Sequence, residues 1–264
     1  MFWYCSKLTS VTDLDVSKST NCQGLFSHCS NLTSVPVLDV SKSTNCQDLF
    51  GYCSNLTSVP VLDFSSCTNM QTVYDNCPKL TNVVLKNTSN ATTFKWCFSG
   101  DYFLESIDGL DTSNATNLCG MFNRDLLYPN SGLKTIPYLD TAKATDMSTM
   151  FNKNNQLEKI TQLDFKSLVS YTNIFYSCTK LTYINILNFG YSSKFIGTFD
   201  FSYCPWGSGS TENLQTVKDS LITNSFDRKT AGYSTMTIYL STATKALLTD
   251  AEKAQITAKG YTIA

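Results

Sequence analysis

The chain has 264 residues, of which 16% are charged, and its formal net charge is −1. Arg124 and Arg228 are the only arginines beside a modest set of lysines. A surface that follows nucleic-acid phosphates normally clusters Lys and Arg, so this composition speaks against binding to nucleic acid and, equally, against a patch for anionic membranes.

A repeat of 24 residues runs through most of the sequence. Such self-similarity predicts a solenoid, because each repeat buries its apolar side only by stacking on its neighbours. We therefore expect an α/β repeat solenoid made mostly of short parallel β-strands and turns, with a small C-terminal helical cap. The repeat is marked by an apolar pair that ends in an aromatic residue at most positions: Met1-Phe2, Leu25-Phe26, Leu49-Phe50, Val73-Tyr74, Cys97-Phe98, Met121-Phe122, Met150-Phe151, Ile174-Phe175 and Thr198-Phe199.

One repeat, from Cys29 to Tyr52, illustrates the expected local structure. Thr33, Ser34, Lys42 and Gln47 are expected to face outward. The inward set is Cys29, Leu32, Val35, Leu38, Val40, Cys46, Leu49 and Phe50. We predict a short strand at about Thr33 to Leu38, stacked in parallel on its neighbours at roughly 4.8 Å per repeat. A single helical turn is expected near Gln47 to Phe50, and the Ser, Thr and Pro content excludes a long helix.

An acidic column follows each predicted strand. Asx-turns, in which the side-chain oxygen accepts a hydrogen bond from the backbone two residues on, would explain it, and an Asn amide oxygen could serve equally. Calcium bridging neighbouring repeats is the alternative, and it would need several oxygens per ion. The column consists of Asp15, Asp39, Asp63, Asn87, Asp111, Asp140, Asp164 and Asn188.

Eleven cysteines would leave one thiol unpaired in a disulfide framework. Most fit the repeat instead: Cys5, Cys29, Cys53, Cys77 and Cys178 share one column. Another column exchanges Cys22 and Cys46 for Met, Leu and Phe, as a packing position does. We expect buried free thiols and no zinc, because a ladder at this spacing is not a tetrahedral cluster.

Two irregularities interrupt the repeat just after the Cys column. The first is an insertion at Leu126 to Asn130 that contains Tyr128, and the second runs from Ser202 to Asn213 with Tyr203 and Trp206. Both should emerge from one rim of a solenoid and would frame a ligand site. The alternative is tolerated loop growth, with Trp206 simply covering the last repeat.

The outward positions of the predicted strands offer a second candidate surface. The first repeats are nearly identical there, and variation increases towards the C-terminal half. A specific partner is therefore expected to contact Asp108, Lys159, Tyr183 and Asn185.

The segment SGLKTIPYLDTAKATDMSTMF and the repeat described above resemble the BspA-like leucine-rich repeats of bacterial surface proteins. The shared pattern is a Cys-x-x-Leu start, a Leu-Asp turn and a Met-Phe end, and the resemblance covers roughly residues 1–200. It implies a leucine-rich-repeat-like fold and a surface or secreted protein, often of gut bacteria, that takes part in adhesion. The family has no shared catalytic residues, so the resemblance assigns none here.

The stretch from Met236 to Ala264 departs from the repeat and predicts a strand, a short helix and a stop. Thr249 and Glu252 have the spacing of a capping box, and Gly260 suits the left-handed position after a helix. We expect the solenoid over 1–218, with Leu214 and Val217 still in a strand. Residues 219–264 should then form a cap that hides the last repeat's apolar face.

At the other end, Met1 stands directly in the Met-Phe column, so we expect this end to lack a cap. A truncated longer chain would explain it, and self-association through the uncovered edge is the alternative. No signal peptide is recognisable, and no apolar stretch is long enough to cross a membrane.

Catalytic interpretations find little support. His28 is the only histidine, and its column looks like a variable surface position, so we expect no metal pair, no Cys-His couple, no cofactor and no enzyme activity. The sequence favours a binding or adhesion module at the cell surface or outside the cell that recognises a host or surface protein or a glycan. The alternative is a structural spacer or attachment element of a larger assembly, such as a virion appendage.

Overall fold

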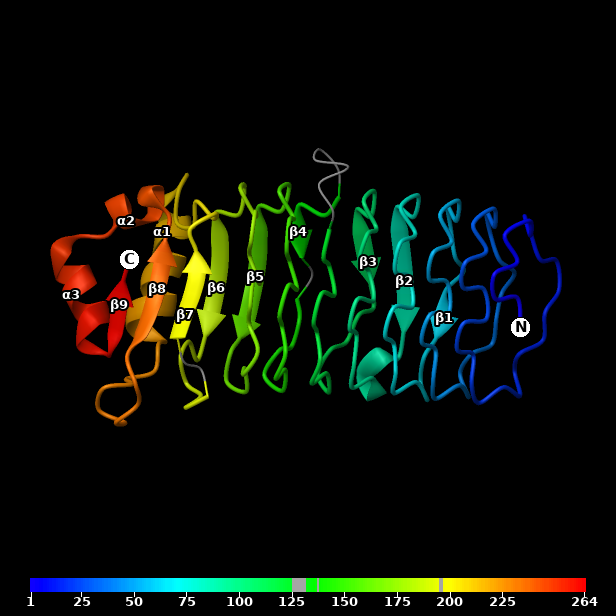
Figure 1. The fold of residues 1–264 in the computed structure, drawn as a ribbon, viewed down its shortest axis with the longest axis horizontal. Helices are drawn as coiled ribbons and strands as arrows, with labels where there is room; N and C mark the ends of the chain where they lie inside the picture. The colour runs from blue at the N-terminus through cyan, green and yellow to red at the C-terminus, as the bar shows by residue number, and fades with distance from the viewer. Residues whose placement is uncertain (125–131, 137, 195–196) are drawn as a thin grey trace. The chain divides into compact units, whose positions relative to one another are not determined.

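The computed structural model describes residues 1–124, 132–136, 138–194 and 197–264. These residues form two compact units, an N-terminal unit over Met1–Leu133 and a C-terminal unit over Lys134–Ala264. Short parallel strands and turns dominate both units, and the helices lie near the C-terminus (Figure 1). The coarse expectation of an α/β repeat fold with few helices is therefore confirmed.

In the N-terminal unit, strands one repeat apart pair in parallel in the order β1-β2-β3. Equivalent asparagines and a threonine also bridge in parallel, from Asn21 to Asn45, to Asn69, to Thr93 and to Asn117. Each pairing advances by one repeat, so the sequence period is the structural period. The elements are β1 (Leu62–Asp63), β2 (Asn82–Lys86), the 3₁₀ turn η1 (Thr88–Asn90) and β3 (Ser106–Asp108).

Prolines limit the strands of the first repeats. Residues 1–61, all of which are described, contain no strand, so the expected strand at Thr33 to Leu38 is wrong. Thr57 still donates its N–H to the oxygen of Thr33 at 3.1 Å, but Pro36 and Pro60 have no N–H to extend the ladder. Val84 occupies the same column in β2, which reaches five residues.

The core is a column of stacked rings. Phe2, Phe26, Phe50, Tyr74, Phe98 and Phe122 stack in sequence at centroid distances of 5.4–5.8 Å. Most of the inward set of the Cys29 repeat is confirmed, with Cys29, Leu32, Val40 and Phe50 fully buried, but Val35 is only half-buried. The expected helical turn near Gln47 is wrong, because Asp48 has a φ of 56°, which a right-handed helix cannot contain.

The acidic column forms Asx-turns, as expected. Asp15, Asp39, Asp63, Asp111, Asp140 and Asp164 each accept a hydrogen bond from the N–H two residues on, at 2.8–3.1 Å. The two asparagines behave differently from the expectation. Asn87 and Asn188 adopt φ values of 57° and 53° and donate their amides to the aspartate of the preceding repeat.

The thiols are free, and nine of the eleven are buried, whereas Cys5 is exposed and Cys119 is half-buried. In the main cysteine column, Cys29, Cys53, Cys77 and Cys178 donate to carbonyl oxygens at 3.0–3.1 Å. Burial raises the pKa of Cys53 to about 12. The column is thus a packing position, as expected, with a weak hydrogen bond added.

The C-terminal unit holds two parallel sheets, β4-β5-β6 and β7-β8-β9. Trp206 is fully buried beside α1, and its indole N–H donates to Ile184 in β6 and to Thr216 in α1. Its strands and helices are β4 (Thr135–Ile136), β5 (Lys159–Asp164), β6 (Tyr183–Leu187), β7 (Gly197–Phe201), α1 (Thr211–Lys218), the π-helical turn η2 (Asp219–Thr223), β8 (Met236–Leu240), α2 (Thr242–Leu247), α3 (Asp250–Ala258) and β9 (Tyr261–Ile263).

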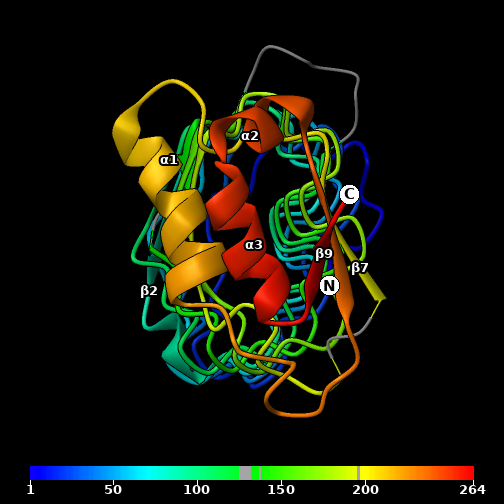
Figure 2. The same ribbon diagram turned by 90° about the vertical axis from the view of Figure 1, so that its left-hand side faces the viewer.

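Part of the predicted cap is confirmed. β8 forms, Thr249 and Glu252 make the full capping box of α3, and Gly260 has a φ of 91°. The strand expected at Leu214 and Val217 is wrong, because both lie in α1, which Ser210 caps. Helical backbone continues from α1 into η2, across residues 218 and 219. Lys218 at the end of α1 forms an ion pair with Glu252 of α3 at 2.8 Å, and α3 contacts η2, which continues α1 (Figure 2).

The last ring of the repeat column is also placed differently. Phe201, not Phe199, stacks on Phe175, at 5.3 Å and 19°. Cys204 accordingly occupies the cysteine column, with its thiol aimed at the oxygen of Phe175. The ring position therefore comes two residues later than the 24-residue period predicts. The irregularity of this repeat begins before β7.

Candidate binding surface

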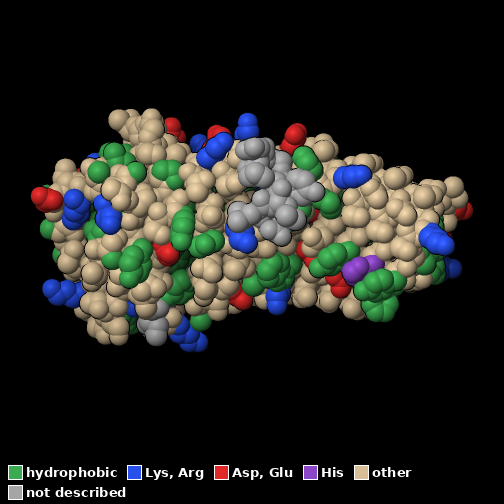
Figure 3. Space-filling model, turned by 45° about the horizontal axis from the view of Figure 1, so that its top comes forward, with side chains coloured by type: hydrophobic (Ala, Val, Ile, Leu, Met, Phe, Trp, Pro, Cys, Tyr) green, Lys and Arg blue, Asp and Glu red, His purple; other side chains and the backbone are tan. Residues whose placement is uncertain are grey.

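Three rings stack on the outside of the N-terminal unit. The His28 ring lies between Tyr4 and Tyr52, at centroid distances of 4.1 and 4.6 Å and nearly parallel to both. Tyr4 is 60% exposed and Tyr52 is 44% exposed. Figure 3 shows the histidine on the surface with hydrophobic side chains at its sides. This exposed stack is separate from the buried ring column of the core.

The backbone fixes the stack. Tyr4, His28 and Tyr52 have φ values of 60–62°, a conformation that favours glycine, and their N–H groups donate to oxygens one repeat further on. Left-handed backbone at a bulky residue costs about 1–3 kcal/mol, and it recurs in this column at Asn76, Lys153 and Ser177, so it is a feature of the repeat. The chain keeps aromatic side chains at positions where glycine would be least strained.

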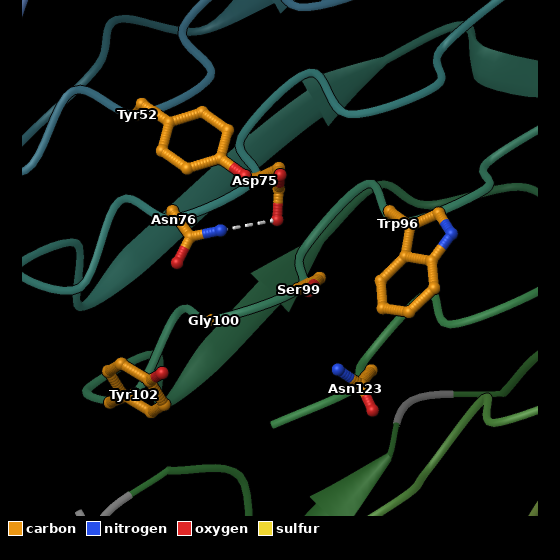
Figure 4. A pocket seen from close by; sticks show the side chains of 8 residues that line it. All are labelled: Tyr52, Asp75, Asn76, Trp96, Ser99, Gly100, Tyr102 and Asn123. Carbon is orange, nitrogen blue, oxygen red and sulfur yellow. Dashed lines mark hydrogen bonds between the residues drawn. The ribbon is translucent and has the colours of Figure 1, made fainter. Parts of the chain in front are cut away.

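Beyond Tyr52 the ladder of rings opens into a hollow of about 310 Å³. The same column continues with Asn76 and then Gly100, whose missing side chain leaves the space open. An added Cβ at Gly100 would lie 2.6 Å from the amide oxygen of Asn76. The hollow is lined by Tyr52, Asp75, Asn76, Trp96, Ser99, Gly100, Tyr102 and Asn123 (Figure 4).

Asp75 is the charged group of this hollow and is only 6% exposed. Burial raises the pKa of its carboxyl to about 6, although hydrogen bonds from Ser99, Asn76 and Tyr52 act in the opposite direction. Asn76 donates to it at 2.9 Å, and Figure 4 shows the Tyr52 hydroxyl beside it. No described Lys or Arg forms an ion pair with Asp75.

Trp96 borders the opposite side of the hollow (Figure 4). It too has a positive φ, 57°, and is half-buried. Its ring covers Gly120, where an added Cβ would lie 2.7 Å from the indole. Gly120 therefore makes room for the indole, and Trp96 leaves part of its surface towards the hollow.

Of the residues predicted from the sequence, Lys159 and Tyr183 come together. They pair in register between β5 and β6, and the Lys159 ammonium lies 4.2 Å from the Tyr183 ring centroid. Glu212 lies 4.0 Å from the same ammonium. Asn185 follows two residues on in β6 and is half-buried. This group belongs to the C-terminal unit, whereas exposed Asp108 ends β3 in the N-terminal unit.

The two predicted insertions give a mixed outcome. Tyr203 is exposed and lies 4.6 Å from the Tyr176 ring. Trp206 is wrong as a surface contact, because it is fully buried against Phe201 and α1, and its carbonyl accepts from Thr244. Tyr128 and the insertion at Leu126 to Asn130 lie outside the described residues.

Sequence reasoning missed the Tyr4, His28 and Tyr52 stack. The signal was present, because three planar rings follow one another at the repeat period. The later residues of the same column vary in type, and this variation concealed the three rings. Asp75, Trp96 and Tyr102 had no such signal, since their meeting depends on turns that only the structure places.

The described residues were compared with the needs of metal ions and of membrane-spanning helices. No group of three or more His, Cys, Asp or Glu side chains there could hold a metal ion. Among the described helices, none is both long and apolar enough to cross a bilayer.

Comparison with known proteins places most of the chain in one family. No curated protein matches the sequence. Residues 1–87 and 68–189 match a family described as Mycoplasma protein of unknown function, DUF285. The two matches together cover more than half of the chain, which therefore belongs to the DUF285 family.

Proposed function

We propose that this protein is a non-enzymatic binding module that uses the exposed rings of its N-terminal unit. The stack of Tyr4, His28 and Tyr52 is the observation that carries the proposal. Tyr and Trp supply large contact areas at a small loss of side-chain entropy, and they are enriched at binding surfaces. Here the backbone orders the rings before any partner arrives, which lowers the entropy that binding must overcome.

The proposal includes a leucine-rich-repeat-like solenoid of the BspA-like kind. Parallel bridges between residues one repeat apart support it within the N-terminal unit. Parallel pairing of Lys159 with Tyr183 supports it within the C-terminal unit. A solenoid would present equivalent side chains at a fixed spacing, which suits an extended partner.

The partner we propose is a protein or glycan met at the cell surface or outside the cell. Planar rings pack against the C–H faces of sugars and against apolar side chains alike, while Asn76, Ser99 and Asn123 offer hydrogen bonds at the hollow. The few clustered cations make nucleic acid a poor partner.

An array of mucins, glycans and matrix proteins tests the proposal. The full chain should bind a subset of the array, and Tyr52→Ala and Trp96→Ala should each weaken that binding at least about tenfold, as loss of a central aromatic contact does. Tyr203→Ala is the matched control, because Tyr203 is an equally exposed ring in the other unit.

Two results would count against the proposal. Binding that Tyr203→Ala abolishes, and that Tyr52→Ala leaves intact, would move the site to the C-terminal unit. No binding anywhere on the array would favour a structural spacer instead.

A further inference from the structure

Tyr52 and Trp96 present aromatic surface on two sides of the hollow (Figure 4). His28 stacks on one face of Tyr52 at 4.6 Å, and Tyr52 also lines the hollow. Tyr102 contributes less, because the Arg124 guanidinium already lies 5.5 Å from its ring centroid. The aromatic contact available to a ligand is therefore that of Tyr52 and Trp96.

The charge of the hollow is negative. Asp75 lines it, and the neighbouring charge of Asp48 adds to the cost of ionising Asp75. Asp101 lies behind the wall, fully buried, with a pKa that burial raises well above its usual range. Arg124 acts on Asp101 and contacts Tyr102, but it does not line the hollow. A cationic ligand group would supply the counter-charge that Asp75 lacks.

The rings beside Asp75 decide which cation fits. The Asp75 carboxylate accepts from Asn76 at 2.9 Å, and Tyr52 and Trp96 line the same hollow. A primary ammonium binds chiefly through three N–H donors, which ring faces do not satisfy. A quaternary ammonium has no such donors, since it is held by charge and by aromatic faces.

We infer that the hollow between Tyr52 and Trp96 binds a quaternary ammonium group of the choline type, with Asp75 as its counter-ion. The inference rests on the proposed binding function and names the ligand chemistry of that site. At about 310 Å³ the hollow is within the size range of small-molecule sites, roughly 300–1,000 Å³.

Calorimetric titration of the full chain with choline chloride tests this inference at pH 7.5. The neutral isostere 3,3-dimethylbutan-1-ol is the first comparison, and choline should bind at least about tenfold more tightly, since only choline gains from charge and ring faces. Nα-acetyl-lysine amide is the second comparison and should bind more weakly than choline.

Three variants test which residues hold the choline group. Asp75→Asn keeps the shape and removes the charge, so choline affinity should fall about tenfold. Trp96→Ala should cause a loss of similar size. Asp13→Asn, at an exposed acid of the same unit, should change nothing.

The pH profile separates charge from packing, because choline stays cationic throughout. Affinity should fall as the pH drops below about 6, where Asp75 takes up its proton. The titratable groups that face Asp75 are Tyr52, Asp48 and, behind it, Asp101. Asp75→Asn should abolish the pH dependence.

Equal affinity for choline and its neutral isostere, tighter binding of the lysine amide, or full affinity in Asp75→Asn would each overturn the inference. Absence of choline binding would overturn it too. If Trp96→Ala still weakened binding on the array, the proposed function would stand without this ligand. If choline did not bind and Trp96→Ala left binding on the array unchanged, the hollow would not be a binding site.

Discussion

Single residues tie neighbouring repeats together through their rings. The Phe50 ring is fully buried and stacks on Phe26 at 5.8 Å and on Tyr74 at 5.6 Å. Phe50→Ala should therefore lower the free energy of unfolding by about 3–5 kcal/mol, the usual cost of removing a buried phenyl group. Urea denaturation followed by circular dichroism measures it. Val37→Ala, at a side chain that is 81% exposed, is the control and should stay within about 0.5 kcal/mol.

Thiol accessibility is a second property of single residues. Cys5 is exposed and Cys119 is half-buried, while burial raises the pKa of the thiols of Cys77 and Cys97 well above the usual range. Ellman's reagent should label Cys5 first and Cys119 more slowly, because the thiolate is the reactive form. All eleven cysteines should react in denaturant. Rapid labelling of Cys77 in the native protein would contradict the buried column.

Asp75 links the candidate site to stability. Its folded pKa of about 6 lies above the usual value of 3.8, so ionisation disfavours the fold. The contribution of Asp75 to the free energy of unfolding is fully present below about pH 3.8. It is lost as the pH rises to about 6, a change of about 3 kcal/mol. Asp75→Asn should remove this slope in denaturant titrations run across that range. An unchanged slope would mean that Asp75 is not buried in solution.

Among the secondary-structure elements, the C-terminal helix α3 has a testable cap. Thr249 accepts from the N–H of Glu252, and the Glu252 carboxylate accepts from the N–H of Thr249 at 2.8 Å. Thr249→Ala should cost about 1 kcal/mol, as loss of an N-cap side chain does. Thr242→Ala, at an exposed residue of α2, is the control in the same thermal melts. Equal melting temperatures for the two variants would contradict the cap.

Elements were predictable where the repeat is regular. The Asx-turns, the cysteine column and the α3 cap depend on neighbours within a few residues or on one repeat spacing, and the sequence contains both. The strand predicted at Thr33 does not form, because Pro36 lacks the backbone N–H that a strand ladder needs. The repeat periodicity carries no information about backbone donors. Helix α1 was missed although Leu214 and Val217 have the three-residue spacing of one helix face and Ser210 is a local N-cap.

The candidate site shows the same limit more strongly. Tyr4, His28 and Tyr52 share a column in the sequence, but their stacking depends on left-handed backbone at each position. Asp75, Trp96 and Tyr102 occupy three different columns. They lie together because Gly100 leaves space and Gly120 makes room for the Trp96 indole. The repeat spacing does not predict either effect.

For the molecule as a whole, the two compact units carry different surfaces. The N-terminal unit has the ring stack and the acidic hollow, whereas the C-terminal unit has the contact between Lys159 and Tyr183 and the buried Trp206 of its cap. The N-terminal unit of this DUF285 chain presents a stack of three ordered rings on its surface. The binding function we propose belongs to that surface.

Hydroxyl-radical footprinting of the full chain, alone and with the mucin or matrix protein it binds on the array, tests this claim most directly. We expect Tyr52, His28 and Trp96 to lose most of their oxidation in the complex, while Tyr203 and Tyr239, exposed rings of the C-terminal unit, oxidise as before. Protection confined to Tyr203 or Tyr239, with the N-terminal rings oxidised as in the free protein, would contradict it.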